Sequence, residues 1–171
     1  MPRPYAVIDL DGVLADVGHR LHHLERRPKD WAAFFAGLDD DPLLLEGLAV
    51  ARRLSEEHRV VYLSGRPERT RARTQAWLDR HDVPRGRVLL RRDHDRRPAR
   101  VLKVGVLRRL AARAEVAVLV DDDPQVCAAA RAAGFAVLEA TWARPEPTLL
   151  EAQEGDAAGD AAGDAAGDAR T

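Results

Sequence analysis

The sequence predicts an α/β protein built on a three-layer, Rossmann-like parallel sheet. Short apolar segments rich in Val, Ile and Leu alternate with longer segments whose apolar residues recur at helical spacing. The short segments are apolar throughout, which is typical of strands that helices cover on both faces. A chain of 171 residues is long enough for one compact domain with a sizeable core.

Each expected element follows from this alternation. The expected strands are the apolar segments 5–8, 60–63, 88–90, 116–120 and 136–138. The expected helices are 42–58, 68–81, 99–114 and 124–133. Pro124 suits the first turn of the last helix, and Gly134 marks its end.

Residues 17–41, which follow the first strand, predict at most a small helical or looped flap. Trp31, Phe34 and Phe35 have the spacing of one helical face, so we expect them to pack against the domain. Three histidines between positions 19 and 23 raise the alternative of a zinc site, but they lack regular ligand spacing. A solvated basic face is the favoured interpretation.

The composition changes beyond Pro147. A four-residue repeat of Gly, Asp, Ala and Ala runs from Gly155 to Ala169. Alanine is its only apolar residue, so the repeat cannot bury enough surface to offset chain entropy. The sequence therefore predicts a domain over residues 1–147 and a disordered tail over 148–171.

Composition also restricts the class of protein. The formal net charge is −1, so the overall charge does not favour binding to nucleic acid or to a membrane. An anionic substrate would have to bind at a local basic patch. Cys127 is the single cysteine, which excludes an internal disulfide and suggests a reducing compartment. The sequence has neither a leader pattern nor an apolar run of membrane length, so we expect a soluble, cytoplasmic protein. No particular oligomeric state is predicted.

The first strand ends in two closely spaced acids, Asp9 and Asp11, with Gly12 permitting a turn that keeps them together. Two carboxylates at the mouth of a buried strand repel each other unless a cation neutralises them, and Mg²⁺ is the usual ion for such oxygen ligands. A calcium loop is a weaker alternative because it needs a preceding helix and a closing Glu. A plain acidic turn stays open from this motif alone.

Polar residues follow three of the expected strands directly: Asp9, Ser64 and Asp121. The carboxyl ends of parallel strands line one crevice, so these side chains are expected to meet there. Lys103, one of two lysines in an Arg-rich chain, lies in the first turns of an expected helix. Taken singly, each has an ordinary interpretation as a turn, a surface or a helix-terminal residue.

These motifs resemble the haloacid dehalogenase (HAD) superfamily of phosphohydrolases over about residues 5–142. Within it, the chain is most similar to the 3′-phosphatase domain of bacteriophage-type polynucleotide kinase-phosphatases. The residues that carry the narrower likeness are an Arg-rich loop before Lys103 and the segments Leu63-Ser64-Gly65-Arg66, Trp77-Leu78 and Asp121-Asp122 with Gln125-Val126.

The resemblance implies a catalytic role for four residues. Asp9 would be the nucleophile that forms an aspartyl phosphate, and Asp11 would protonate the leaving oxygen and then deprotonate water. Ser64 would hydrogen-bond a phosphoryl oxygen, and Lys103 would offset the developing charge.

The resemblance also implies metal and substrate contacts. Mg²⁺ would be bound by Asp9, the Asp11 backbone carbonyl, and Asp121 or Asp122. Substrate would be bound by Arg20, Arg66 and Gly65. Two positions depart from the family pattern: Ala99 replaces an acid four residues before the motif lysine, and Val13 stands where Thr is common.

The implied substrate is a nucleic acid 3′-phosphate, with a small nucleotide or metabolite phosphate as the alternative. No segment between the motifs is long enough to form a large cap domain over the crevice, so the crevice should admit the end of a polynucleotide. Arg69, Arg71 and Arg73 either contact phosphates near its rim or are ordinary solvated helix charges. No Gly-x-x-x-x-Gly-Lys-Ser/Thr motif occurs, so we expect either a stand-alone phosphatase or one half of a split system with a separate kinase partner.

Two other classes of protein share part of this pattern. A phospho-accepting receiver module also pairs acids at strand ends with a Ser/Thr and a Lys, although its adjacent acids come at the first strand and its acceptor at a later one. A catalytically silent scaffold is disfavoured because the set of motif residues is intact.

Overall fold

The computed structural model describes residues 2–143, which contain a single five-stranded sheet in the order β3-β2-β1-β4-β5, parallel throughout. Its strands are β1 (Tyr5–Ile8), β2 (Arg59–Pro67), β3 (Arg87–Arg91), β4 (Val116–Asp121) and β5 (Val137–Glu139). This order confirms the predicted fold class. Receiver-type domains have the order 2-1-3-4-5, so the receiver alternative is wrong.

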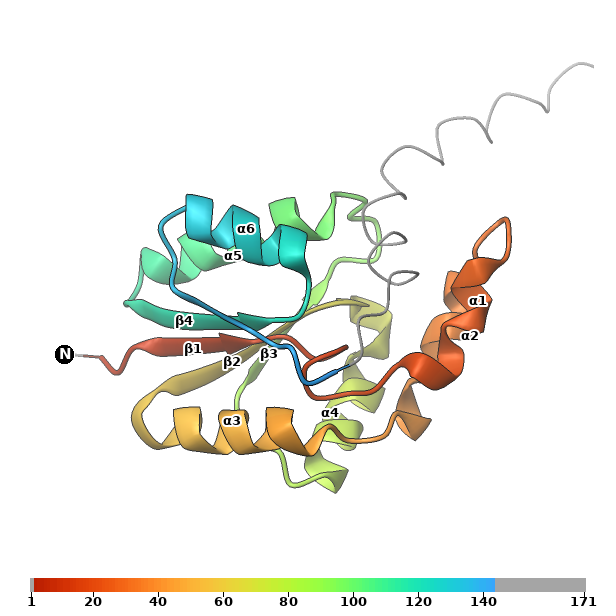
Figure 1. Ribbon diagram of the computed structural model, residues 1–171, viewed down its shortest axis with the longest axis horizontal. Coiled ribbons are helices and arrows are strands. Elements are labelled where there is room, and N and C mark those ends of the chain that lie inside the picture. The colour runs from red at the N-terminus through yellow and green to blue at the C-terminus, as the bar shows by residue number, and fades with distance from the viewer. Residues whose placement is uncertain (1, 144–171) are drawn as a thin grey trace, which may run out of the picture.

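Helices cover both faces of the sheet, as Figure 1 shows. Helices α3 (Leu45–Glu57) and α4 (Arg71–Arg80) lie on one face, and α5 (Ala99–Ala111) and α6 (Pro124–Ala132) lie on the other. Each helix is one to four residues shorter than its expected range. The first part of the 68–81 segment is instead a 3₁₀ turn, η3 (Glu68–Thr70).

Alternation along the strands divides the core into two layers. Val7 and Val61 pack with residues of α5 and α6, whereas Ile8 and Tyr62 pack with residues of α3 and α4. Successive side chains of a strand point to opposite faces, and here both faces are buried. The middle of each central strand is therefore apolar at successive positions rather than at every second one.

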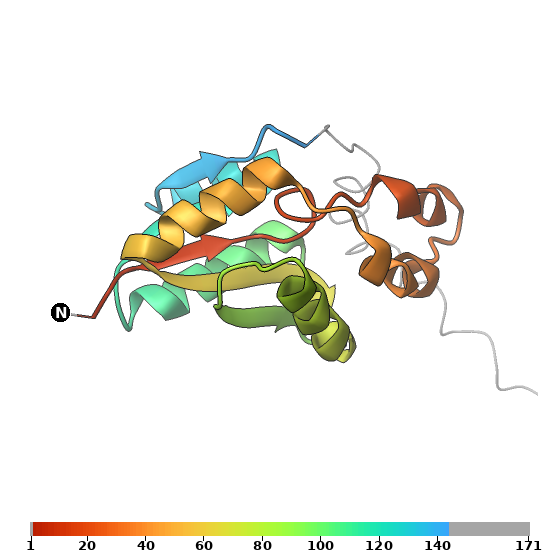
Figure 2. The same ribbon diagram turned by 90° about the horizontal axis from the view of Figure 1, so that it is seen from below.

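The flap, residues 17–41, projects beyond the carboxyl ends of the strands (Figure 2). It contains η1 (Gly18–Arg20), α1 (His22–Glu25), α2 (Trp31–Ala36) and η2 (Leu38–Asp40). Phe34 is buried in a separate cluster with Val17, Leu21 and Leu24, against which Trp31 and Phe35 pack. Contrary to the expectation that these aromatics pack against the domain, they pack mainly within the flap, which has enough apolar residues to form a small core of its own. The Phe35 ring also lies beside Arg69 of the domain.

Two further predictions concern the rest of the chain. The predicted disordered tail, residues 148–171, lies outside the described residues. Within residues 2–143, no helix is long and apolar enough to cross a membrane.

Candidate active site

The candidate site lies at the carboxyl ends of β1 and β4, the two strands between which the strand order reverses. Such a switch point is the usual ligand site of an open parallel sheet. Asp9 follows β1, Asp121 ends β4, and Lys103 reaches them from α5. Lys103 Nζ donates hydrogen bonds of 2.7 Å to Oδ2 of Asp9 and of 2.7 Å to Oδ2 of Asp121. The three side chains are buried, and their contacts bring Asp9 and Asp121 together at the edge of the sheet where the sequence predicted that they would meet.

The boundary at Ser64 differs from the expected one. β2 continues to Pro67, so Ser64 lies within the strand rather than after it. The pairing of β2 with β3 shifts register between Leu63 and Pro67, which frees the intervening residues from a regular ladder. Ser64 is fully buried, and its Oγ accepts a 3.2 Å hydrogen bond from the Arg66 backbone N–H. Gly65 is half-buried beside the side chain of Arg91.

Three carboxylates form a potential metal site. Asp9, Asp121 and Asp122 each offer an oxygen, and these oxygens lie within 4.8 Å of one another. Hard oxygen ligands of this kind suit Mg²⁺. Within residues 2–143, no histidine belongs to a group of three potential ligands, which argues against the zinc alternative.

Crowding of these acids changes their pKa values. Burial raises the pKa of Asp9 to about 7, since the opposing effect of Lys103 is only partial and Asp121 raises it further. Burial, Asp9 and Asp121 together raise the pKa of Asp122 to about 8. Burial lowers the pKa of Lys103, but Asp121 and Asp9 more than offset this, so its pKa lies above the usual value. The cluster therefore has an excess of negative charge that a divalent cation would neutralise.

Gly12 is required beside Asp122 for two reasons. Its φ of +79° lies in the left-handed region that favours glycine. A Cβ added at Gly12 would lie 2.0 Å from Oδ2 of Asp122, so any side chain there would displace that carboxylate.

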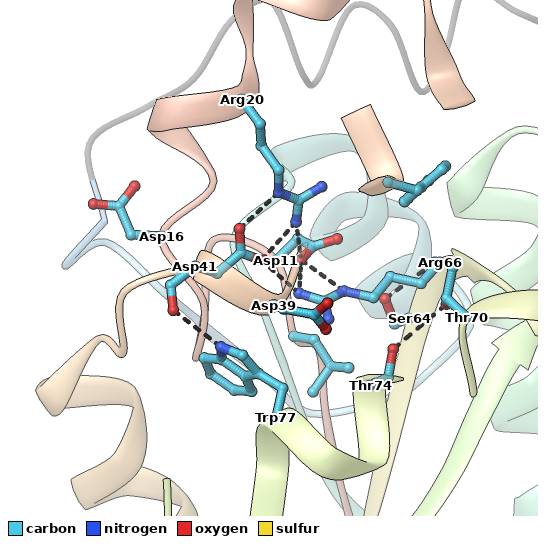
Figure 3. A network of polar contacts seen from close by, with 12 residues as sticks. Asp11, Asp16, Arg20, Asp39, Asp41, Ser64, Arg66, Thr70, Thr74 and Trp77 are labelled. Atoms are coloured by element: carbon cyan, nitrogen blue, oxygen red, sulfur yellow. Dashed lines mark hydrogen bonds and ion pairs between the residues drawn. The ribbon is translucent and has the colours of Figure 1, made fainter. Parts of the chain in front are cut away.

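Asp11 is held by two arginines rather than by the acidic cluster (Figure 3). Its Oδ1 accepts hydrogen bonds from Arg66 Nε at 2.9 Å, Arg66 Nη2 at 2.5 Å and Arg20 Nη2 at 3.1 Å. Burial alone would raise the pKa of Asp11, but Arg66 and Arg20 lower it below the usual value. The prediction that the basic residues of the flap are solvated is wrong for Arg20. This residue is buried because it pairs with the carboxylates of Asp11 and Asp41.

Sequence reasoning missed Asp41, which lies where the flap rejoins the domain. Its buried carboxylate accepts hydrogen bonds from Arg20, Arg66 and His19. Asp41 belongs to an acidic run, Asp39-Asp40-Asp41-Pro42, that is typical of a solvated turn. No local signal distinguishes it from its two neighbours, because its burial arises only when the flap folds back.

Arg66 also carries a polar atom with no partner. Its Nη1 is buried and makes no hydrogen bond within the part of the chain that the structure describes. A buried donor that is left unsatisfied is destabilising. A guanidinium donor free in this position suits the oxygen of an anionic ligand such as phosphate.

The other arginines expected near the rim of the crevice are Arg69, Arg71 and Arg73, and all three pair with surface carboxylates. Each forms an ion pair on the exposed surface: Arg69 with Asp93, Arg71 with Glu68, and Arg73 with Asp39. These contacts favour the interpretation as ordinary surface charges. The two departures from the family pattern, Ala99 and Val13, are both buried apolar residues.

A family model described as the polynucleotide kinase PNKP phosphatase domain matches residues 4–142. A chain of the Pnkp1/Rnl/Hen1 complex superposes with a TM-score of 0.67 at 22% identity, covering 81% of this chain and 46% of that one. This chain thus spans less than half the length of that relative. No curated protein sequence matches significantly.

Two structures of HAD-family proteins show the same fold. One is the haloacid dehalogenase-like hydrolase SP0104 from Streptococcus pneumoniae, with a TM-score of 0.54, 14% identity, and coverage of 89% of this chain and 91% of that one. The other is the HAD enzyme BT-2542 from Bacteroides thetaiotaomicron, in complex with magnesium and inorganic phosphate. Its TM-score is 0.51 at 12% identity, covering 86% of this chain and 99% of that one.

Proposed function

The chain belongs to the polynucleotide kinase PNKP phosphatase domain family of HAD phosphatases, and on this premise we propose that it is a magnesium-dependent phosphomonoesterase that removes the 3′-phosphate from polynucleotide ends. The observation that carries the proposal is the contact of Lys103 with both Asp9 and Asp121 at the switch point of the sheet. A structural ion pair would need neither the neighbouring Asp122 nor the unpaired donor of Arg66.

Asp9 is the proposed nucleophile. One of its carboxylate oxygens attacks phosphorus, the bond from phosphorus to the ester oxygen breaks, and an aspartyl phosphate forms. Ser64 and Lys103 hydrogen-bond the phosphoryl oxygens as negative charge develops on them. A water then attacks the phosphorus, the bond to Asp9 breaks, and inorganic phosphate leaves.

Asp11 is the proposed acid and base. It gives a proton to the leaving ester oxygen in the first step and takes one from the attacking water in the second. In the arrangement described, Arg66 and Arg20 keep Asp11 ionised, which is the form that accepts a proton from water. When a substrate phosphate accepts hydrogen bonds from Arg66 and Arg20 in place of Asp11, the protonated form of Asp11 becomes more stable.

Asp9, Asp121 and Asp122 supply the oxygen donors that fit Mg²⁺, with the Asp11 backbone carbonyl as the proposed further ligand. The ion would supply charge neutralisation, which relieves repulsion between a carboxylate nucleophile and a phosphate dianion. The three oxygens within 4.8 Å of one another support this assignment, and burial together with the charges of Asp9 and Asp121 raises the pKa of Asp122.

The small flap supports a substrate with an extended remainder. Residues 17–41 contain only short helices, which favours a crevice open enough for a polynucleotide end. Arg66 and Arg20 are the proposed phosphate contacts, with Gly65 beside them. A small nucleotide or metabolite phosphate is the alternative substrate. A separate kinase is a proposed partner. A location in the cytoplasm stays a prediction.

One assay tests the proposal. The protein is incubated with a 3′-phosphorylated oligonucleotide, its 5′-phosphorylated counterpart, a mononucleotide and p-nitrophenyl phosphate, each with Mg²⁺ or with chelator. Phosphate release from the 3′-phosphorylated oligonucleotide, lost with chelator, is expected. Release from the mononucleotide alone would favour the alternative substrate, and release from none would contradict the phosphatase assignment.

A further inference from the structure

The Asp41 carboxylate contacts both arginines that hold Asp11. Arg20 donates to it through Nε and Nη2, each at 2.7 Å, and Arg66 donates through Nη2 at 2.9 Å (Figure 3). The Asp41 side chain is 0% exposed. A carboxylate removed from water so completely is costly unless it is paired, so these contacts strongly constrain all three side chains.

Asp41 also connects three parts of the molecule. Its backbone carbonyl accepts a 2.9 Å hydrogen bond from Trp77 Nε1, and Trp77 is a buried residue of α4. Arg20 comes from the flap and lies with its Cζ 4.1 Å from the centre of the Phe34 ring. Arg66 comes from β2. Through Asp41, the position of the flap is therefore tied to the sheet and to α4.

The four charged groups form a balanced set, with two guanidinium groups and two carboxylates. Nη2 of each arginine is shared between Asp11 and Asp41. Most of the hydrogen bonds of Arg20 to carboxylates go to Asp41, and its contact with Asp11 is the longest of the set at 3.1 Å. Without the Asp41 charge, both guanidinium groups would turn toward Asp11 as their nearest carboxylate and displace it.

We infer that Asp41 is a positioning residue, which acts through Arg20 and Arg66 to hold the Asp11 carboxyl where it meets the leaving oxygen of the substrate. The inference rests on the proposed function, because it assigns Asp41 a part in the protonation step. Asp41 itself touches neither the acidic cluster nor the proposed nucleophile among the contacts of the described residues.

A comparison of leaving groups tests this role. An alkyl leaving group, such as the 3′-oxygen of an oligonucleotide, needs a proton, whereas p-nitrophenolate leaves readily without one. Misplacement of Asp11 should therefore lower kcat/KM for the 3′-phosphorylated oligonucleotide far more than for p-nitrophenyl phosphate. For Asp41→Asn we expect a loss of about 30-fold or more on the oligonucleotide and of about 3-fold or less on the aryl ester.

The matched control is Asp39→Asn. Asp39 is a partly exposed flap residue whose carboxylate pairs with Arg73 of α4, so its loss also removes a contact between flap and domain. It should leave the ratio of the two kcat/KM values unchanged. Asp41→Glu, which keeps the charge, should fall between the wild type and Asp41→Asn.

The outcomes separate this inference from the proposed function. If the wild type hydrolyses neither ester, the proposed function fails. If the wild type is active and Asp41→Asn lowers both kcat/KM values equally, or neither, only the role of Asp41 is overturned. If Asp41→Asn does not fold, Asp41→Glu decides: a loss selective for the oligonucleotide supports the role, and an equal change or none overturns it.

Discussion

Nζ of Lys103 lies 2.7 Å from Oδ2 of Asp9, although 94 residues separate the two in the sequence. The contact joins α5 to the end of β1, and the same amine bridges to Asp121 at the end of β4. Because all three groups are buried, the ammonium is the local counter-charge for two carboxylates. The interaction therefore contributes both to the fold and to the proposed chemistry.

Replacing Lys103 by Met should uncouple these contributions. Lys103→Met leaves Asp9 and Asp121 buried without their counter-charge, which should destabilise the metal-free protein by about 3–5 kcal/mol. Mg²⁺ should restore part of this stability but not the activity. Urea unfolding with and without Mg²⁺ measures the effect, with the exposed Arg108→Met on the same helix as control. Unchanged stability of Lys103→Met would contradict the assigned ion pairs.

Asp9→Asn and Asp11→Asn should each abolish turnover of the 3′-phosphorylated oligonucleotide. The first removes the nucleophilic carboxylate and the second the proton donor, so we expect losses of about 100-fold or more from each. Phosphate release measures the loss, and circular dichroism checks that the fold persists. The matched control is Asp16→Asn, whose exposed carboxylate accepts a local hydrogen bond from the Gly18 backbone N–H. Full activity in either site variant would refute the assigned role.

The sheet and most of the candidate site could be predicted because the relevant signals are local. The apolar strands β1 and β4 lead into Asp9 and Asp121, and the parallel topology brings these two acids to one edge. Lys103 was identifiable as an isolated lysine in an Arg-rich chain, with the family resemblance supplying its role. Segment boundaries were less predictable, since the irregular pairing of β2 at Ser64 depends on β3.

The flap could not be predicted in the same way. Arg20 and Asp41 are a charged pair that the sequence alone assigns to a solvated surface, yet both are buried. Their burial depends on the flap folding onto α4 and on the presence of Arg66 from a distant strand. Interactions of this kind have no period or spacing in the sequence, so they emerge only from the tertiary structure.

Gly12→Ala should weaken metal binding. The new Cβ would meet the Asp122 carboxylate at 2.0 Å and displace it, so we expect the Mg²⁺ concentration for half-maximal activity to rise about 10-fold or more. The matched control is Gly134→Ala, because Gly134 has a similar φ of +88° but no heavy atom within 4 Å of the added Cβ. Gly134→Ala should cost about 1 kcal/mol of stability and leave the Mg²⁺ requirement unchanged. Equal Mg²⁺ requirements in the two variants would rule out the proposed contact of Gly12 with a metal ligand.

The stability of the metal-free protein should fall as the pH rises from about 4 to 8. In the folded state the pKa values of Asp9 and Asp122 are raised to about 7 and about 8, above the ordinary value of 3.8. The folded state therefore binds more protons than the unfolded state in this window, which makes the slope of the unfolding free energy with pH negative.

Mg²⁺ should reverse this trend, because it binds the ionised carboxylates. The increase in Tm on adding Mg²⁺ should be larger at pH 8 than at pH 5, as measured by thermal unfolding at both pH values. Asp122→Asn should flatten the pH dependence of the metal-free protein and reduce the Mg²⁺ effect at pH 8. An equal increase in Tm at the two pH values would exclude Asp9 and Asp122 as metal ligands, because Mg²⁺ must compete with protons for carboxylates whose pKa values lie in this window.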